Sequence, residues 1–149
     1  MKNTDTAKAK GYDADKKVSG IKRHLAVDSQ GLIHAVALTT ANVTDRAGAI
    51  QAMTEYQENL SWVQSVLVDG SYTGQPFAQA VKTQLGATVQ VAKRSQLSTF
   101  AVTPKRWVVE RTFAWLEKCR RLWKNPERNL NTSLQFVVLA HLVMLLKRS

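Results

Sequence analysis

The stretch VQSVLVDGSYTG, residues 63–74, is a short apolar run that ends abruptly at Asp69 and Gly70. Its length and its Val and Leu content predict a buried strand with an acid at its carboxyl end. A helix over residues 75–85 and a strand over residues 88–92 are expected to follow. This order is typical of α/β domains, in which ligands bind beyond the carboxyl ends of strands. The alternative for Asp69 is a helix cap or a turn former before Gly70.

Upstream of this unit, residues 22–40 read KRHLAVDSQGLIHAVALTT and contain two runs rich in Val, Leu, Ile and Thr. The runs flank DSQG at residues 28–31, a turn tetrapeptide with Asp first and Gly last, so we expect a β-hairpin. A helix over residues 46–59 should follow, with Thr44 or Asp45 as its cap.

The length of 149 residues fits one domain with its own core. Residues 1–20 are polar and Lys-rich and show no apolar period. We therefore expect a flexible basic arm over residues 1–20 that contributes no core strand, followed by an α/β domain over residues 21–149.

The segment KRWVVERTFAWLEKCRRLWK, residues 105–124, predicts one long helix. At about 3.6 residues per turn, its apolar residues fall on one face. That face comprises Val108, Thr112, Trp115, Leu116, Cys119, Leu122 and Trp123. Glu110 lies opposite in a basic field, where a carboxylate could bind a metal ion beside a docked anion. The alternative is a solvated face with two ion pairs, Arg106 with Glu110 and Glu117 with Arg121.

The formal net charge is +10, from 21 Lys and Arg against 11 Asp and Glu, which predicts a polyanionic partner. Charge alone cannot separate DNA from RNA or from a membrane surface. Cys119 is the only cysteine, so the chain can build neither a disulfide nor a thiolate zinc site. The apolar run FVVLAHLVMLL, residues 136–146, is shorter than the roughly 20 residues that span a membrane. We expect a buried last helix, no secretory signal and a cytosolic protein.

Four segments of the chain carry a resemblance to a known family. They are KKVSGIKRHLAVDSQG (16–31), ANVTDRAGA (41–49), VLVDGSYTG (66–74) and RWVVERTFAWLEKCRRL (106–122). In this order and with similar spacing, they resemble the carboxy-terminal half of DDE-type bacterial insertion-sequence transposases, in the group numbered five of that classification. The likeness extends over nearly the whole chain and is highly specific.

The resemblance implies a ribonuclease-H-like core, with a mixed sheet and flanking helices, that uses Mg²⁺ or Mn²⁺. Such a core nicks DNA at the element's ends with water and joins the freed 3′-hydroxyls to target DNA. In the family pattern, Asp69 matches the second acid of the catalytic triad, Glu110 the third, and Arg106 the basic residue of the glutamate motif. The complete enzyme is implied to be a homo-oligomer that binds double-stranded DNA on the bacterial nucleoid, without a membrane partner.

The first acid of the family closes the central strand, just upstream of a segment like residues 2–13. The chain begins with Met1 at that point, so we expect the first strand and its Asp to be missing. Asp28 is followed by Ser-Gln, as the first acid often is, but its place in the predicted turn accounts for it. The fragment is expected to be inactive alone, being either truncated or completed by an upstream polypeptide. The alternatives are a non-catalytic DNA-binding remnant that regulates an intact transposase, and a basic RNA-binding protein.

Eight basic residues are candidates for contacts with DNA phosphates, although a solvated surface predicts the same composition. They are Lys22, Arg23, Lys93, Arg94, Arg111, Lys118, Arg120 and Arg121. The resemblance implies a basic residue after the glutamate, displaced here to Lys118 or Arg120, and an aromatic residue where Thr103 stands. Trp107 and Phe113 flank the polar face of the helix, where either could stack on an unpaired base or pack against the sheet.

Overall fold

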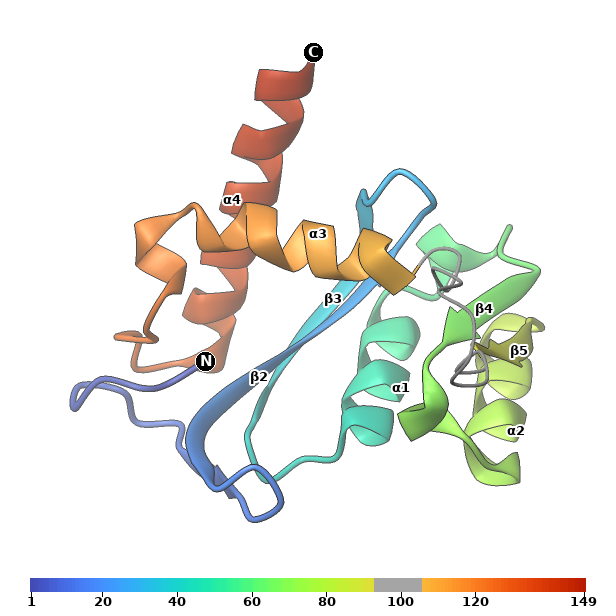
Figure 1. Cartoon of the computed structure of the whole chain (residues 1–149), viewed down its shortest axis with the longest axis horizontal. Helices are drawn as coiled ribbons and strands as arrows, with labels where there is room; N and C mark the ends of the chain where they lie inside the picture. The colour runs from blue at the N-terminus through green and yellow to red at the C-terminus, as the bar shows by residue number, and fades with distance from the viewer. Residues whose placement is uncertain (93–105) are drawn as a thin grey trace, which may run out of the picture.

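The computed structural model describes residues 1–92 and 106–149. Its elements are β1 (Gly11–Asp13), β2 (Val18–Val27), β3 (Ile33–Thr40), α1 (Asp45–Glu55), the 3-10 helix η1 (Glu58–Leu60), β4 (Ser65–Val68), η2 (Gly70–Tyr72), α2 (Gln75–Leu85), β5 (Thr88–Val91), α3 (Arg106–Glu117), η3 (Arg120–Leu122) and α4 (Leu130–Arg148). The long β2–β3 hairpin lies at the centre, with α1 on one side and α3 and α4 on the other (Figure 1). β4, β5 and α2 lie beyond α1 (Figure 1). The α/β class predicted from the sequence is confirmed.

The strands β1, β2 and β3 form an antiparallel sheet with β2 in the middle. The Asp28 carboxylate accepts hydrogen bonds from the backbone N–H groups of Gln30 and Leu32, at 2.8 and 3.0 Å, and so forms the turn. Gly31 has a φ of +84°, which glycine adopts without strain. The predicted hairpin and the turn role of Asp28 are confirmed, and β2 begins earlier than predicted, at Val18.

The N-terminal segment, predicted to be an arm without a core strand, contains the short edge strand β1 and the first residues of β2. β1 pairs with the start of β2, and Met1 exchanges two backbone hydrogen bonds with Ile21, at 2.7 and 3.0 Å. Asp13 is buried, and its carboxylate accepts a hydrogen bond from Lys22, which holds the pKa of Asp13 below its usual range. The composition of the arm did not reveal this strand because backbone pairing needs no apolar side chain.

The predicted strand, helix, strand unit is confirmed. β4 and β5 pair in parallel, and α2 connects them with the predicted bounds. The prediction that β4 is buried is wrong, because Val66 and Val68 pack against a core whereas Ser65 and Leu67 are exposed. Among the described residues, β4 and β5 form a sheet of their own, so these residues do not by themselves build the single mixed sheet that was expected.

Two hydrophobic cores lie on the two faces of the hairpin. Because side chains alternate along a strand, Ala35 and Ala37 of β3 face α1 and α2, whereas Val36 and Leu38 face α3 and α4. Leu116, which is 1% exposed, anchors α3 in the second core. The hairpin is therefore the middle layer of an α/β/α arrangement, and it fixes the position of α3.

Two helices end earlier than the sequence predicts. α1 is capped by Thr44, as expected, and ends at Glu55. α3 ends at Glu117 because the chain is extended at Cys119. On the predicted apolar face, the buried residues are Val108, Thr112, Leu116 and Leu122. Trp123 was assigned to the same face, but it follows the break in the helix and is 60% exposed.

α4 is not the buried helix that its composition predicts. Ser133, Val137 and Ala140 are buried, but the outer side of α4 exposes six large apolar side chains. These are Val138, Leu139, Leu142, Val143, Leu145 and Leu146. The C-terminal part of α4 extends beyond the rest of the fold (Figure 1). By length and composition alone α4 could cross a membrane, a test that core helices of soluble proteins also pass.

Candidate catalytic acids and nucleic-acid interface

Asp69 directly follows β4 at its carboxyl end, as predicted. Its carboxylate caps η2 and accepts hydrogen bonds from the backbone N–H and the hydroxyl of Ser71, at 2.9 and 2.5 Å. Arg46 of α1 donates from Nε to the Ser71 carbonyl at 2.9 Å, which ties this turn to α1. Burial raises the pKa of Tyr72 to about 12, and the charge of Asp69 acts in the same direction. The structure confirms the capping alternative for Asp69, and this cap orients a half-buried carboxylate at the end of the strand.

Glu110 lies on the exposed side of α3, away from the buried Val108 and Thr112. Thr112 donates a hydrogen bond from its hydroxyl to the carbonyl of Gly31, in the hairpin turn, at 2.8 Å. This contact and the burial of Leu116 fix the rotation of α3 about its axis. The predicted opposition between Glu110 and the apolar face is therefore confirmed.

A divalent metal ion would need oxygen ligands, and the carboxylates of Asp69 and Glu110 are of the kind that Mg²⁺ prefers. The two acids belong to different parts of the fold, one after β4 and one in α3. Within the described residues, no group of three or more His, Cys, Asp or Glu side chains could hold a metal ion. The donor chemistry fits such an ion, and the pairing of Asp69 with Glu110 stays a prediction.

Lys22, expected to contact phosphate, instead lies inside a network of oxygen atoms. Its Nζ is 2.8 Å from the Asp13 carboxylate and 3.3 Å from the Asp45 carboxylate. It also donates to the Val43 carbonyl at 2.9 Å. An ammonium group surrounded in this way holds β1 and the start of α1 against β2, and it is a poor candidate for a phosphate contact.

Arg23 is also placed differently from the exposed phosphate contact that was expected. It is half-buried under α3, with its guanidinium 5.8 Å from the centroid of the Phe113 ring. Burial lowers the pKa of Arg23, and the charge of Glu117 acts in the opposite direction. Its Nη1 atom is buried, with no hydrogen-bond partner among the described residues.

Of the remaining basic candidates, Arg111 is half-buried, and the others fall into two groups. The exposed ones are Lys118, Arg120 and Arg121. Lys93 and Arg94 lie outside the described residues, as does Thr103. Arg121 forms an ion pair with Glu127 at 2.5 Å, and not the pair with Glu117 that the solvated-face alternative predicts. Arg106 is the first residue of α3.

A stacked series of side chains runs along α3 and was not recognised in the sequence. The Arg111 guanidinium lies between the rings of Trp107 and Trp115, 4.5 and 4.6 Å from their centroids. Arg148 of α4 lies over the Trp115 ring at 4.5 Å. The spacing of four residues along α3 could have revealed the first three members, because such side chains are neighbours on a helix. Arg148 comes from another helix and has no local signal.

Residues 1–146 match the family model of the transposase DDE domain. The chain belongs to the DDE transposase family. A protein of Burkholderia cepacia assigned as the transposase for insertion sequence element IS402 is 31% identical over 121 residues. The matched region covers 76% of this chain and 57% of that relative, so the chain spans little more than half of its length. No solved structure matches the chain.

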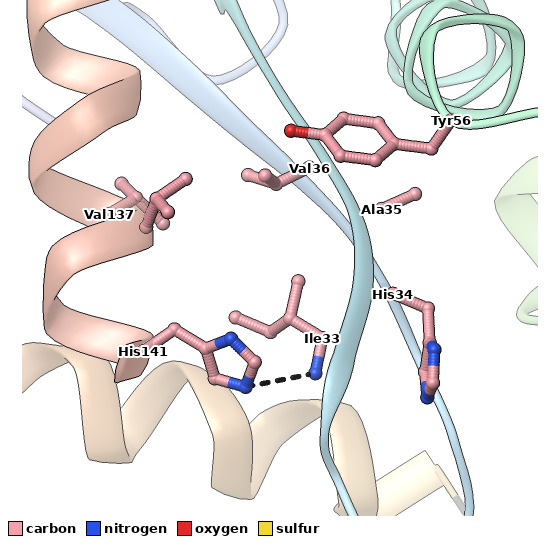
Figure 2. A pocket seen from close by; sticks show the side chains of 8 residues that line it. Ile33, His34, Ala35, Val36, Tyr56, Val137 and His141 are labelled. Carbon is pink, nitrogen blue, oxygen red and sulfur yellow. Dashed lines mark hydrogen bonds between the residues drawn. The ribbon is translucent and has the colours of Figure 1, made fainter. Parts of the chain in front are cut away.

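A cavity of about 130 Å³ lies between β3 and α4 of this transposase (Figure 2). Tyr56 and His141 line it, and Figure 2 shows apolar side chains such as Val36 and Val137 between them. The Nε2 atom of His141 accepts a hydrogen bond from the backbone N–H of Ile33 at 3.3 Å. Because its Nε2 atom is engaged by the backbone of Ile33 in β3, we assign His141 the role of an anchor for α4.

Two histidines, His24 within the hairpin and His141 packed against it, should make the stability of the transposase depend on pH. Burial lowers the pKa of His141 and of His24, each below its ordinary 6.5. The unfolded chain therefore binds more protons than the folded chain at acidic pH. The contribution of these two histidines to the free energy of unfolding should be fully present well above pH 6.5 and should be lost as the pH drops through and below that value.

Thermal unfolding measured between pH 8 and pH 5 checks this expectation. His141→Gln removes one titrating group, so the acid-induced decrease in Tm should become smaller. The side-chain oxygen of Gln can still accept the hydrogen bond from the backbone N–H of Ile33. An unchanged decrease in this variant would show that the His141 contact does not contribute.

Proposed function

We propose that this chain is the part of a DNA strand-transfer enzyme that supplies the second and third catalytic carboxylates, Asp69 and Glu110. The enzyme would cleave DNA at the ends of an insertion sequence and join the freed 3′-hydroxyls to target DNA. Family membership supports the reaction class. The position of Asp69 after β4 and the exposure of Glu110 on α3 support the assignment of the two acids.

The observation that carries the proposal is an open sheet edge on β2. The backbone N–H and C=O groups of Ile21 both form hydrogen bonds with Met1, so they point away from β3. Every second residue of an antiparallel strand points to the same edge, and the backbone groups of Arg23 and Leu25 therefore lie on it too. In the described part of the chain, no strand pairs with these two residues. An edge of this kind is a template for a further strand.

Two other features, one beside β2 and one beside β4, support the proposal of an additional strand. The buried Nη1 of Arg23 needs a hydrogen-bond partner, because an unpaired buried polar group costs about 1–3 kcal/mol. β4 has one strand partner, β5, in the described residues, and its Leu67 is 43% exposed. We infer that one strand from outside the described residues pairs with both β2 and β4. It would join the two sheets into the mixed ribonuclease-H-like sheet and carry the third carboxylate.

Asp69, Glu110 and the added carboxylate would hold the divalent metal ion. When bound, Mg²⁺ or Mn²⁺ supplies Lewis-acid polarisation of the scissile phosphodiester and activates water for attack. The chain itself orients Asp69 through Ser71 and fixes α3 through Thr112. Arg106, one turn before Glu110, would contact the phosphate, while Lys118, Arg120 and Arg121 would hold the duplex further along. The complete protein would act as a homo-oligomer on the bacterial nucleoid.

A strand-transfer assay with Mn²⁺ and DNA carrying the terminal repeats tests the proposal. The chain is assayed alone and together with the polypeptide encoded directly upstream of Met1. We expect no strand transfer from either component and clear strand transfer from the mixture. Activity of residues 1–149 alone would overturn the need for an added strand. No activity from the mixture would favour the non-catalytic DNA-binding remnant.

A further inference from the structure

The outermost member of the stacked series on α3 has a large open surface. Trp107 is 47% exposed, whereas Arg111 covers one side of it at 4.5 Å. Burying an aromatic ring is favourable, so a stack with a purely structural role would be expected to cover its terminal ring. Trp107 is also close to the proposed chemistry, because it lies three residues before Glu110, within one helical turn.

The stack beneath Trp107 is held in place by the hairpin turn. Arg111 donates a hydrogen bond from Nη2 to the carbonyl of Gln30 at 2.8 Å. Its guanidinium also lies 4.6 Å from the Trp115 ring, which Arg148 covers from the other helix at 4.5 Å. A ring supported in this way can receive a flat partner without losing further side-chain freedom, which lowers the entropic cost of binding.

The far end of the stack opens into a groove between α3 and α4 of about 280 Å³. Its lining residues are Trp115, Lys118, Cys119, Ala140, Val143, Met144, Lys147 and Arg148. Three of them are cationic and none is acidic. The path from Trp107 to this groove therefore combines aromatic rings with positive charge, as single-stranded nucleic-acid sites do.

We propose that this surface, from Trp107 along α3 to Lys118 and Lys147, binds single-stranded DNA. An unpaired base stacks on the open side of Trp107, and phosphates along the same strand contact Lys118 and Lys147. The inference rests on the proposed function, since strand cleavage beside Glu110 supplies unpaired nucleotides there. It assigns Trp107 to substrate positioning and adds Lys147 to the DNA contacts.

Binding of a fluorescein-labelled ten-residue oligo(dT) to the 149-residue chain, measured by fluorescence anisotropy in EDTA, tests this inference. One base–aromatic stack is worth enough that Trp107→Ala should weaken binding by about 5- to 100-fold. Trp107→Tyr retains a ring and should bind within about threefold of the unchanged chain. Replacing Lys118 and Lys147 by Gln should make the negative slope of the logarithm of the binding constant against log salt shallower by about 1.4. Each phosphate that is no longer neutralised accounts for about 0.7 of this change.

Trp62→Ala is the matched control, because Trp62 is 62% exposed and belongs to a different part of the fold. It should bind oligo(dT) like the unchanged chain. Equal binding of oligo(dT) by Trp107→Ala and Trp62→Ala would overturn the inference. It would also be overturned if Trp107→Ala weakened the binding of fully paired DNA as much as the binding of oligo(dT). The assay contains no metal ion and no cleavage step. Failed strand transfer with intact stacking on Trp107 would therefore count against the proposed function alone.

Discussion

Replacing Asp69 by Asn should reduce strand transfer by the completed enzyme by about 100-fold or more. A catalytic metal ion stabilises the transition state by several kcal/mol, and each 1.4 kcal/mol corresponds to a factor of ten. The amide oxygen of Asn can still accept the two hydrogen bonds from Ser71, at 2.9 and 2.5 Å in the unchanged chain. The turn after β4 should therefore keep its structure, and the loss would come from the missing charge.

The strand-transfer assay on the completed enzyme measures this effect directly. Glu58→Gln removes an exposed acid in η1 and serves as the matched control, with activity near that of the unchanged enzyme. Thermal unfolding of both variants checks that each is folded. Full activity of a folded Asp69→Asn variant would show that Asp69 only caps η2.

Replacing Leu116 by Ala should lower the free energy of unfolding by about 2–5 kcal/mol, the usual cost of such a cavity in a close-packed core. Leu116 is 1% exposed and packs in the second core with Ile21, Val36 and Val137. It is the main apolar contact of α3 with the hairpin layer. Because whole domains are stable by only about 5–15 kcal/mol, this loss is a large fraction of the total.

Urea unfolding followed by tryptophan fluorescence measures the difference. Leu139→Ala is the matched control, because Leu139 is 52% exposed on α4 and its truncation should cost less than about 0.5 kcal/mol. Similar losses in both variants would mean that α3 is not held against the hairpin through Leu116.

The parts of the fold that the sequence predicts well are those set by local interactions. The hairpin follows from the turn at Asp28 and Gly31, where the carboxylate and a left-handed glycine are both needed. The bounds of α2 agree with the prediction because Gly74 and Gly86 flank it, and Gly86 has the left-handed φ of +66° at the C-cap. β4 and β5 follow from short apolar runs.

The errors concern contacts between distant segments. β1 and Met1 pair with β2 through backbone atoms, which composition does not report. α4 is apolar on most sides, so its sequence predicts burial, but Leu142 and Leu146 have no covering layer in the described residues. Hydrophobicity shows that a helix can be buried and does not show which segment would cover it.

In the candidate site, too, the features set by local sequence were predictable and the contacts between distant segments were not. Asp69 and Glu110 could be selected from the sequence because one ends a strand and the other opposes an apolar helix face. The engagement of Lys22 with Asp13, and the stacking of Arg148 on Trp115, depend on segments far apart in the chain. No local pattern could have predicted either contact.

The most direct test of the central claim is Mn²⁺ binding by the completed protein, followed through the electron paramagnetic resonance signal of the free ion. If Asp69 and Glu110 share one ion, then Asp69→Asn and Glu110→Gln should each weaken binding by about tenfold or more, roughly 1.4 kcal/mol. Glu58→Gln should bind Mn²⁺ like the unchanged protein. Unaltered Mn²⁺ binding by a folded Asp69→Asn or Glu110→Gln variant would contradict the shared site.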